Sequence, residues 1–81
     1  MIKYLPIEDI GDIIRKRVHA TPTHQCNFTL KATGEVVGVR LFNRKRLGYQ
    51  LVHAGSVVLR NVHVDEIARW MVNYSKENNN D

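Results

Sequence analysis

The chain has 81 residues and a formal net charge of +4, with 12 Lys and Arg against 8 Asp and Glu. Hydrophobic residues make up 43% and charged residues 25%, a composition that argues against a disordered chain and predicts a globular domain. No apolar run approaches the roughly 18 residues needed to cross a bilayer, and the first residues lack the basic and apolar regions of an export signal. We therefore expect a cytoplasmic protein whose single cysteine, Cys26, stays reduced.

The first predicted element is a helix between Pro6 and Pro22. Its apolar residues recur at the spacing of one helix face, and the segment carries acids early and bases late, an order that complements the helix dipole. The apolar set is Ile7, Ile10, Ile14 and Val18.

Four runs with a period of two follow, at residues 25–32, 36–42, 47–53 and 57–62. In the third run, Leu47, Tyr49, Leu51 and His53 share one face. Each connection between the runs is short, and short connections join antiparallel neighbours. The pattern predicts a four-stranded antiparallel meander.

The last predicted element is a helix over residues 64–76, with an apolar stripe of Val64, Ile67, Ala68, Met71 and Val72. We therefore predict an α+β fold of order α-β-β-β-β-α, a single domain over residues 1–76, and a disordered polar tail at 77–81. The C-terminal helix should pack on one sheet face, and the N-terminal helix should cover an end or edge of the sheet. The open face would then show Lys31, Arg40 and the turn at 44–46.

The middle of the chain is strongly basic. From Arg15 to Arg60 there are nine Lys or Arg against one acid, Glu35. Such a field attracts polyanions, and a two-stranded ribbon fits the major groove of DNA, so we predict a nucleic-acid-binding regulator that favours DNA over RNA. A solvated turn that protects a sheet edge is the alternative interpretation of the basic hairpin. The candidate contacts are Arg15, Lys16, Arg17, Lys31, Arg40, Arg44, Lys45, Arg46, Gln50 and Arg60.

Two other classes of function stay open. One is a protein-binding inhibitor or adaptor of phage or mobile-element type that docks on an acidic host surface, with Trp70 and Tyr74 at the interface. A homodimer is a further partner that would help so small a domain. Packing over the sheet edge explains Trp70 and Tyr74 equally well.

Catalytic and metal sites have weaker signals. A small ribonuclease would use His53 and Tyr49 beside Arg40 or Arg46, although the leucines on the same strand face predict a core position for that pair. His19, His24 and Cys26 match no standard ligand spacing. We therefore expect no catalytic residue, no metal and no cofactor.

Two stretches resemble known families. The run "GVRLFNRKRLGYQLVHAGSVVLRNVHVDEIARWM" resembles the three-stranded sheet plus helix of integrase arm-binding and plant ethylene-response-type DNA-binding domains, which implies a sheet face in the major groove. The early-strand aromatic residues of those families are missing. A leading helix followed by "FTLKATGEVVGVRLFN" resembles Sm-like RNA-binding proteins, whose fold lacks the long terminal helix. We assign the chain to neither family and transfer no residue roles.

Overall fold

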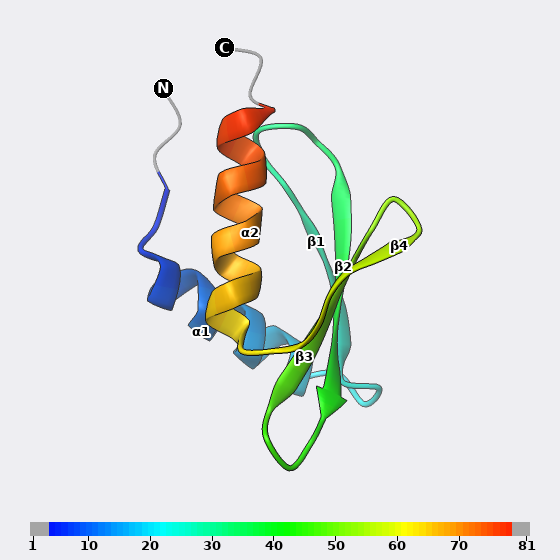
Figure 1. Cartoon of the computed structure of the whole chain (residues 1–81). Coiled ribbons are helices and arrows are strands. Elements are labelled where there is room, and N and C mark those ends of the chain that lie inside the picture. The colour runs from blue at the N-terminus through cyan, green and yellow to red at the C-terminus, as the bar shows by residue number, and fades with distance from the viewer. Residues whose placement is uncertain (1–3, 79–81) are drawn as a thin grey trace.

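The computed structural model describes residues 4–78 and contains two helices and four strands. The strands pair in the order β1-β2-β3-β4, each antiparallel to its neighbour. This arrangement confirms the predicted α+β meander (Figure 1). The elements are α1 Ile7–His19, β1 Gln25–Thr29, β2 Val36–Asn43, β3 Gly48–His53, β4 Ser56–Val62 and α2 Val64–Glu77. The last helix thus includes Glu77, the first residue of the predicted tail, whereas residues 79–81 of that tail lie outside the described residues.

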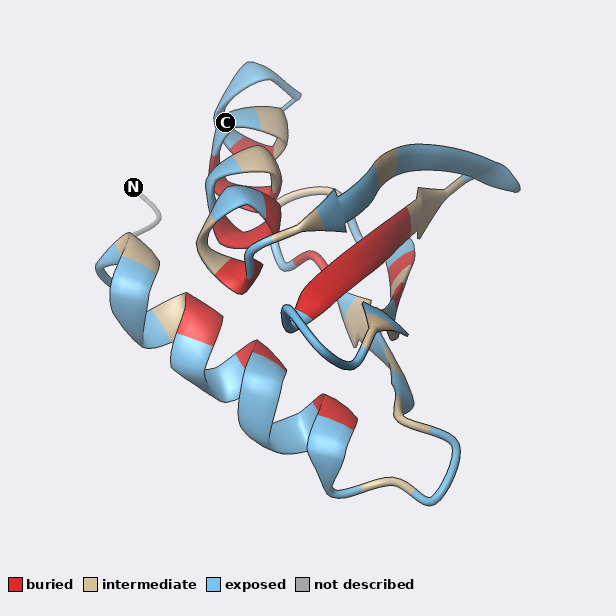
Figure 2. Ribbon diagram, turned by 60° about the horizontal axis from the view of Figure 1, so that its bottom comes forward, coloured by how far each residue is buried: buried red, intermediate tan, exposed pale blue. Residues whose placement is uncertain are grey.

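Both helices lie on the same side of the sheet, so the core is a single layer between helices and strands (Figure 1). Figure 2 shows the buried residues of α1 and α2 turned inward and their outer faces exposed. The N-terminal helix was predicted to cover an end or edge; it contacts α2, β1 and β2 within the same layer. The two central strands contribute apolar core residues at alternate positions, Val37 and Val39 in β2 and Tyr49 and Leu51 in β3, because side chains alternate across a strand. The core comprises Ile14, Val18, Leu30, Val37, Val39, Tyr49, Leu51, Val64, Ile67, Ala68 and Met71.

A glycine allows the two helices to approach closely. Gly11 is buried in α1, and a Cβ at this position would collide with Asp65 Oδ1 and lie 3.3 Å from Val64 Cγ2 at the start of α2. Glycine in a helix costs about 1 kcal/mol relative to alanine. The close packing of α1 against α2 explains why a glycine stands at position 11 despite this cost.

The third and fourth strands depart from the regular pattern. Leu47 was expected on the core side of the third strand, but it lies in the β2–β3 turn with a φ of 49° and is 46% exposed. Between the pairs Tyr49↔Val62 and Leu51↔Leu59, Gln50 faces two residues of β4, Arg60 and Asn61. Such a bulge bends the strand that carries the extra residue. None of the helices in residues 4–78 has the length and apolar character needed to cross a membrane.

Candidate nucleic-acid interface

The face of the sheet away from the helices carries a row of polar side chains that crosses all four strands. The register places Gln25 opposite Arg40 and Arg40 opposite Gln50. On β4, Arg60 and Asn61 together face Gln50, because the register shifts between the pairs Tyr49↔Val62 and Leu51↔Leu59. These residues alternate with the core residues of the same strands, so their side chains point away from the helices. We call Gln25, Arg40, Gln50 and Arg60 the polar row.

Arg60 is held in place by an aromatic ring two strands away. Its guanidinium carbon lies 5.6 Å from the ring centroid of Phe42, a residue of β2, so the side chain crosses β3. Attraction between a cation and a ring face contributes about 0.5–1 kcal/mol at exposed sites. Gln50 lies on the strand that is crossed and is only 8% exposed. Gln50 is therefore less accessible than simple alternation along β3 predicts.

A hollow of about 310 Å³ opens on the same face beside the polar row. Gln25, Asn27, Arg40 and Gln50 supply its polar lining, and Gly38 is among the residues that line it. A Cβ at Gly38 would lie 3.3 Å from Asn27 Oδ1. Because Gly38 has no side chain, a ligand can approach the backbone of β2 between amide groups and a guanidinium.

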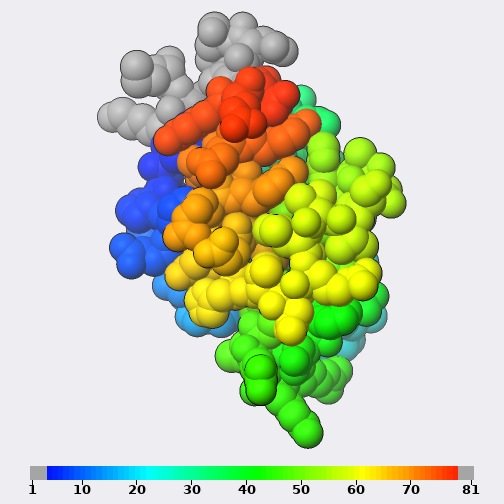
Figure 3. Space-filling view, viewed as in Figure 1, coloured from blue at the N-terminus to red at the C-terminus, as the bar shows by residue number. Residues whose placement is uncertain are grey.

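The three consecutive cations of the chain form the β2–β3 turn. Arg44, Lys45 and Arg46 are all exposed, and we call them the basic tip. Asn43 fixes the turn, since its Oδ1 accepts hydrogen bonds from the backbone N–H groups of Lys45 at 3.1 Å and Arg46 at 3.4 Å. Figure 3 shows the turn projecting from the lower end of the molecule. The basic tip therefore continues the strand that carries Arg40.

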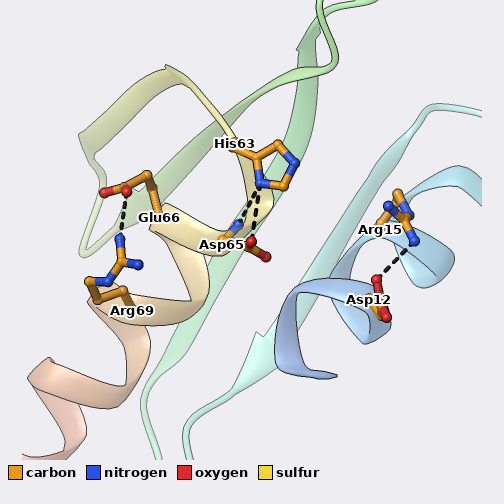
Figure 4. Close-up of polar contacts among 6 residues, drawn as sticks. All are labelled: Asp12, Arg15, His63, Asp65, Glu66 and Arg69. Atoms are coloured by element: carbon orange, nitrogen blue, oxygen red, sulfur yellow. Dashed lines mark hydrogen bonds and ion pairs between the residues drawn. The ribbon is translucent and has the colours of Figure 1, made fainter. Parts of the chain in front are cut away.

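The cations of this surface have no acidic partner within residues 4–78. The Lys and Arg residues that do form ion pairs lie on the helices: Arg15 with Asp12 at 2.8 Å and Arg69 with Glu66 (Figure 4). Unpaired cations on one face produce a local positive field that attracts anions. The five cations concerned are Arg40, Arg44, Lys45, Arg46 and Arg60.

The remaining predicted contacts lie elsewhere. Lys16 is exposed on α1, and Arg17 lies with its guanidinium carbon 5.9 Å from the ring of Phe28, on the helix side of the sheet. Lys31 lies in the β1–β2 turn, at the opposite end of β2 from the basic tip. The basic residues of the middle segment therefore form separate groups on the two sides of the sheet.

Arg17 and Lys31 instead border a second hollow, of about 440 Å³, between the two helices and the end of β1. Its lining is mostly apolar and includes Leu5, Ile13 and Met71. Leu5 is 55% exposed and Ile13 is 41% exposed. Apolar side chains near two cations can bind a partner segment that presents the complementary groups.

Sequence reasoning missed a cluster around the lone acid of the middle segment. Glu35 Oε1 lies 3.0 Å from His53 Nε2, and Glu35 Oε2 accepts a hydrogen bond from the Tyr74 hydroxyl at 2.6 Å. The hydrogen bonds from Tyr74 and His53 hold the pKa of Glu35 below its ordinary value of 4.5. The bond to Glu35 raises the pKa of Tyr74, because it favours the protonated hydroxyl. We call Glu35, His53 and Tyr74 the carboxylate cluster.

The two predicted interface residues pack against this cluster. The rings of Trp70 and Tyr74 are stacked, with centroids 4.9 Å apart and an interplanar angle of 11°. The ring of His53 lies 5.4 Å from Trp70 and 4.9 Å from Tyr74. Packing over the sheet therefore accounts for both aromatic residues. The available sequence signal was Glu35 itself, since it is the only acid from Arg15 to Arg60.

The two residues considered for a ribonuclease have separate partners. Tyr49 is 1% exposed and its hydroxyl lies 2.6 Å from His19 Nε2, whereas His53 bonds to Glu35. Burial raises the pKa of Tyr49. The rings of His19 and His24 lie 5.5 Å apart. Within the described part of the chain, no three His, Cys, Asp or Glu side chains are grouped to hold a metal ion.

Comparison with known proteins found no protein-family model, no curated protein and no solved structure that matches this chain.

Proposed function

We propose that this chain is a small cytoplasmic, non-enzymatic regulator that binds duplex DNA through the basic tip and the polar row. The observation that carries the proposal is the alignment of unpaired cations along one open sheet face, from Arg60 and Arg40 to the tip. Amide groups flank Arg40 on both neighbouring strands, at Gln25 and Gln50. This mixture provides donors for phosphates and both donors and acceptors for base edges.

The shape of the ribbon favours DNA over RNA. The major groove of B-DNA is about 12 Å wide and admits a two-stranded β-ribbon. The major groove of A-form RNA is deep and narrow, and side chains cannot read it. The β2–β3 hairpin ends in the basic tip, so it can enter a groove with its cations beside the phosphates on both sides.

Phosphate neutralisation would supply most of the affinity. Each phosphate contact releases counterions, so the logarithm of the binding constant falls with the logarithm of salt concentration by about 0.9 per contact. With five unpaired cations on this face, we expect a steep salt dependence. Binding by the amide groups alone would depend only weakly on salt.

The test compares two variants that lose the same three positive charges. One replaces Arg44, Lys45 and Arg46 by Ala; the matched control replaces residues 15–17 of α1 by Ala. Fluorescence anisotropy with a labelled duplex, titrated at several salt concentrations, measures affinity and salt slope. We expect the tip variant to bind the duplex at least tenfold more weakly. The slope of the logarithm of the binding constant against the logarithm of salt concentration should become shallower by about two to three, and the melting temperature should not change. The control should lose far less.

Equal losses in the two variants would mean that net charge alone drives binding, and unchanged binding in the tip variant would overturn the proposal. Parallel titrations with single-stranded DNA and structured RNA test the preference for duplex DNA. Tighter binding of RNA would contradict that part of the proposal.

A second candidate function has its own observation. The apolar hollow bordered by Arg17 and Lys31 fits a protein segment that presents an apolar side chain flanked by acids, which is the interface expected of an inhibitor or adaptor. Replacing exposed Ile13 by Asp should abolish capture of such a partner after nuclease treatment and leave duplex binding intact. Capture that persists in this variant would exclude the hollow as the docking site.

A further inference from the structure

The polar row and the basic tip differ in what they can recognise. Phosphate contacts position a protein on DNA but carry no sequence information, whereas contacts to base edges do. The basic tip consists of cations alone. The polar row combines Arg40 with a directly opposite amide, Gln50.

We propose that the polar row reads base identity in the major groove, with Arg40 selecting guanine and Gln50 selecting adenine in neighbouring base pairs. This inference rests on the proposed binding of duplex DNA. An arginine donates two hydrogen bonds to O6 and N7 of guanine, and a glutamine pairs with N6 and N7 of adenine. Cross-strand partners have Cβ atoms about 5 Å apart, which suits two neighbouring base pairs.

The hollow beside Gly38 gives the bases access to these side chains. It is lined by Arg40 and Gln50 together with Gln25 and Asn27, and Gly38 adds no side chain to fill it. Gln50 is only 8% exposed, but it lines this hollow. The hollow is therefore the route by which a base edge reaches the amide of Gln50.

The mobility of the two parts should also differ. Gln50 is nearly buried, so its amide is presented in a restricted set of positions, whereas Arg40 is exposed. The tip side chains are exposed and have no acidic partner among residues 4–78. Restricted donors lose less conformational freedom on binding and so discriminate between bases better than free ones.

The experiment selects binding sites from a pool of randomised duplexes with the full chain, followed by sequencing of the bound fraction. The wild-type protein should enrich a site with guanine and adenine in neighbouring pairs. Arg40→Lys keeps the positive charge but loses the planar fork, so it should lose its preference for guanine by roughly tenfold to a hundredfold. Its affinity for random duplex should stay within about twofold.

Two further variants keep the charge of the face constant. Gln50→Leu removes the amide at similar volume and should lose the preference for adenine alone. Gly38→Val fills the hollow and should weaken the preference at both positions, whereas the tip variant should weaken binding to all sequences alike. Thermal melting of each variant identifies any failure to fold, and exposed Arg40 provides the variant least sensitive to that problem.

The outcomes separate this inference from the proposed function. Binding that depends on the tip but enriches no sequence would overturn base reading and leave duplex binding in place. A site that Arg40→Lys selects unchanged would also overturn it. Failure of the wild-type protein to bind any duplex would remove both proposals together.

Discussion

The two faces of the sheet differ in whether their charged side chains have bonded partners. On the helix side, the one acid between Arg15 and Arg60, Glu35, bonds to both His53 and Tyr74. On the open side, Arg40 and Arg60 have no acidic partner within residues 4–78. Partly buried charges are paired because burial without a partner is costly. The open face avoids this cost by exposure to solvent, and its cations stay available to a ligand.

Under the proposed function, the same strands would serve stability on one side and recognition on the other. Tyr49 and Leu51 of β3 are core residues, while Gln50 between them lines the open hollow. Substitution of the core residues of β3 should affect folding, whereas substitution of Gln50 should affect binding.

The largest effect should come from truncation of Leu51, which is 0% exposed. Leu51→Ala leaves a cavity between the sheet and the helices and should lower the free energy of unfolding by about 2–5 kcal/mol. Val52→Ala, one residue along on the open face, should cost about 1 kcal/mol or less. Urea denaturation followed by circular dichroism measures both. Similar losses in the two variants would contradict the division between faces.

Two glycines of the open face should respond differently to a methyl group. A Cβ at Gly48 would collide with the side chain of Asn61 and lie 3.2 Å from its Cα, so Gly48→Ala should cost about 1–3 kcal/mol. Gly38→Ala meets only Asn27 Oδ1, at 3.3 Å, and should change stability by less than about 1 kcal/mol. Melting temperatures at neutral pH measure the difference. A strong loss in Gly38→Ala would show that the hollow cannot be filled without disturbing the sheet.

The carboxylate cluster predicts a pH dependence confined to the acid range. The pKa of Glu35 is lowered in the folded state, so its stabilising contribution is present above 4.5, its ordinary value, and is lost as pH falls through the lowered value. Glu35→Gln should therefore melt at a lower temperature than the wild type at pH 6, with the difference shrinking toward pH 3. Parallel melting curves over this range measure the effect. A difference in melting temperature that does not change with pH would mean that the Glu35 side chain contributes through its packing and not through its charge.

The smallest effect should come from the exposed ion pair on α1. Arg15 and Asp12 are both exposed, at 46% and 55% of their side chains. Such pairs contribute about 0–1 kcal/mol. Arg15→Ala should lower the melting temperature slightly at low salt and not at high salt. A larger change would mean that Arg15 has a further role in packing.

Much of the fold could be predicted because its signals are local. The period of two in the third run placed Tyr49 and Leu51 on one face, the apolar stripe of α2 included Ile67, and all three are core residues. Short turns made the meander the economical topology. The exception is Leu47, whose apolar side chain suggested a strand residue although its backbone has a φ of 49° in the turn. A hydrophobic period of two does not by itself show at which residue a strand begins.

The candidate site was less predictable than the fold, as individual residues show. Arg40 was placed on the open face by alternation alone. The burial of Gln50, which is only 8% exposed, could not be predicted, because alternation places it on the open face opposite Arg40. The pairing of Glu35 with Tyr74 joins residues 39 positions apart. No periodic pattern extends over such a distance.

Local sequence patterns specify the order of helices and strands, the antiparallel meander and the concentration of positive charge in the middle of the chain. Hydrophobic period and turn chemistry act within a few residues, so they can be read directly. The tertiary structure decided that the cations divide between two sides of the sheet, that Gly38 lines a hollow beside Arg40, and that Glu35 bonds to His53 and Tyr74. These features depend on strand register, bulges and helix docking, which arise from contacts between residues far apart in the chain.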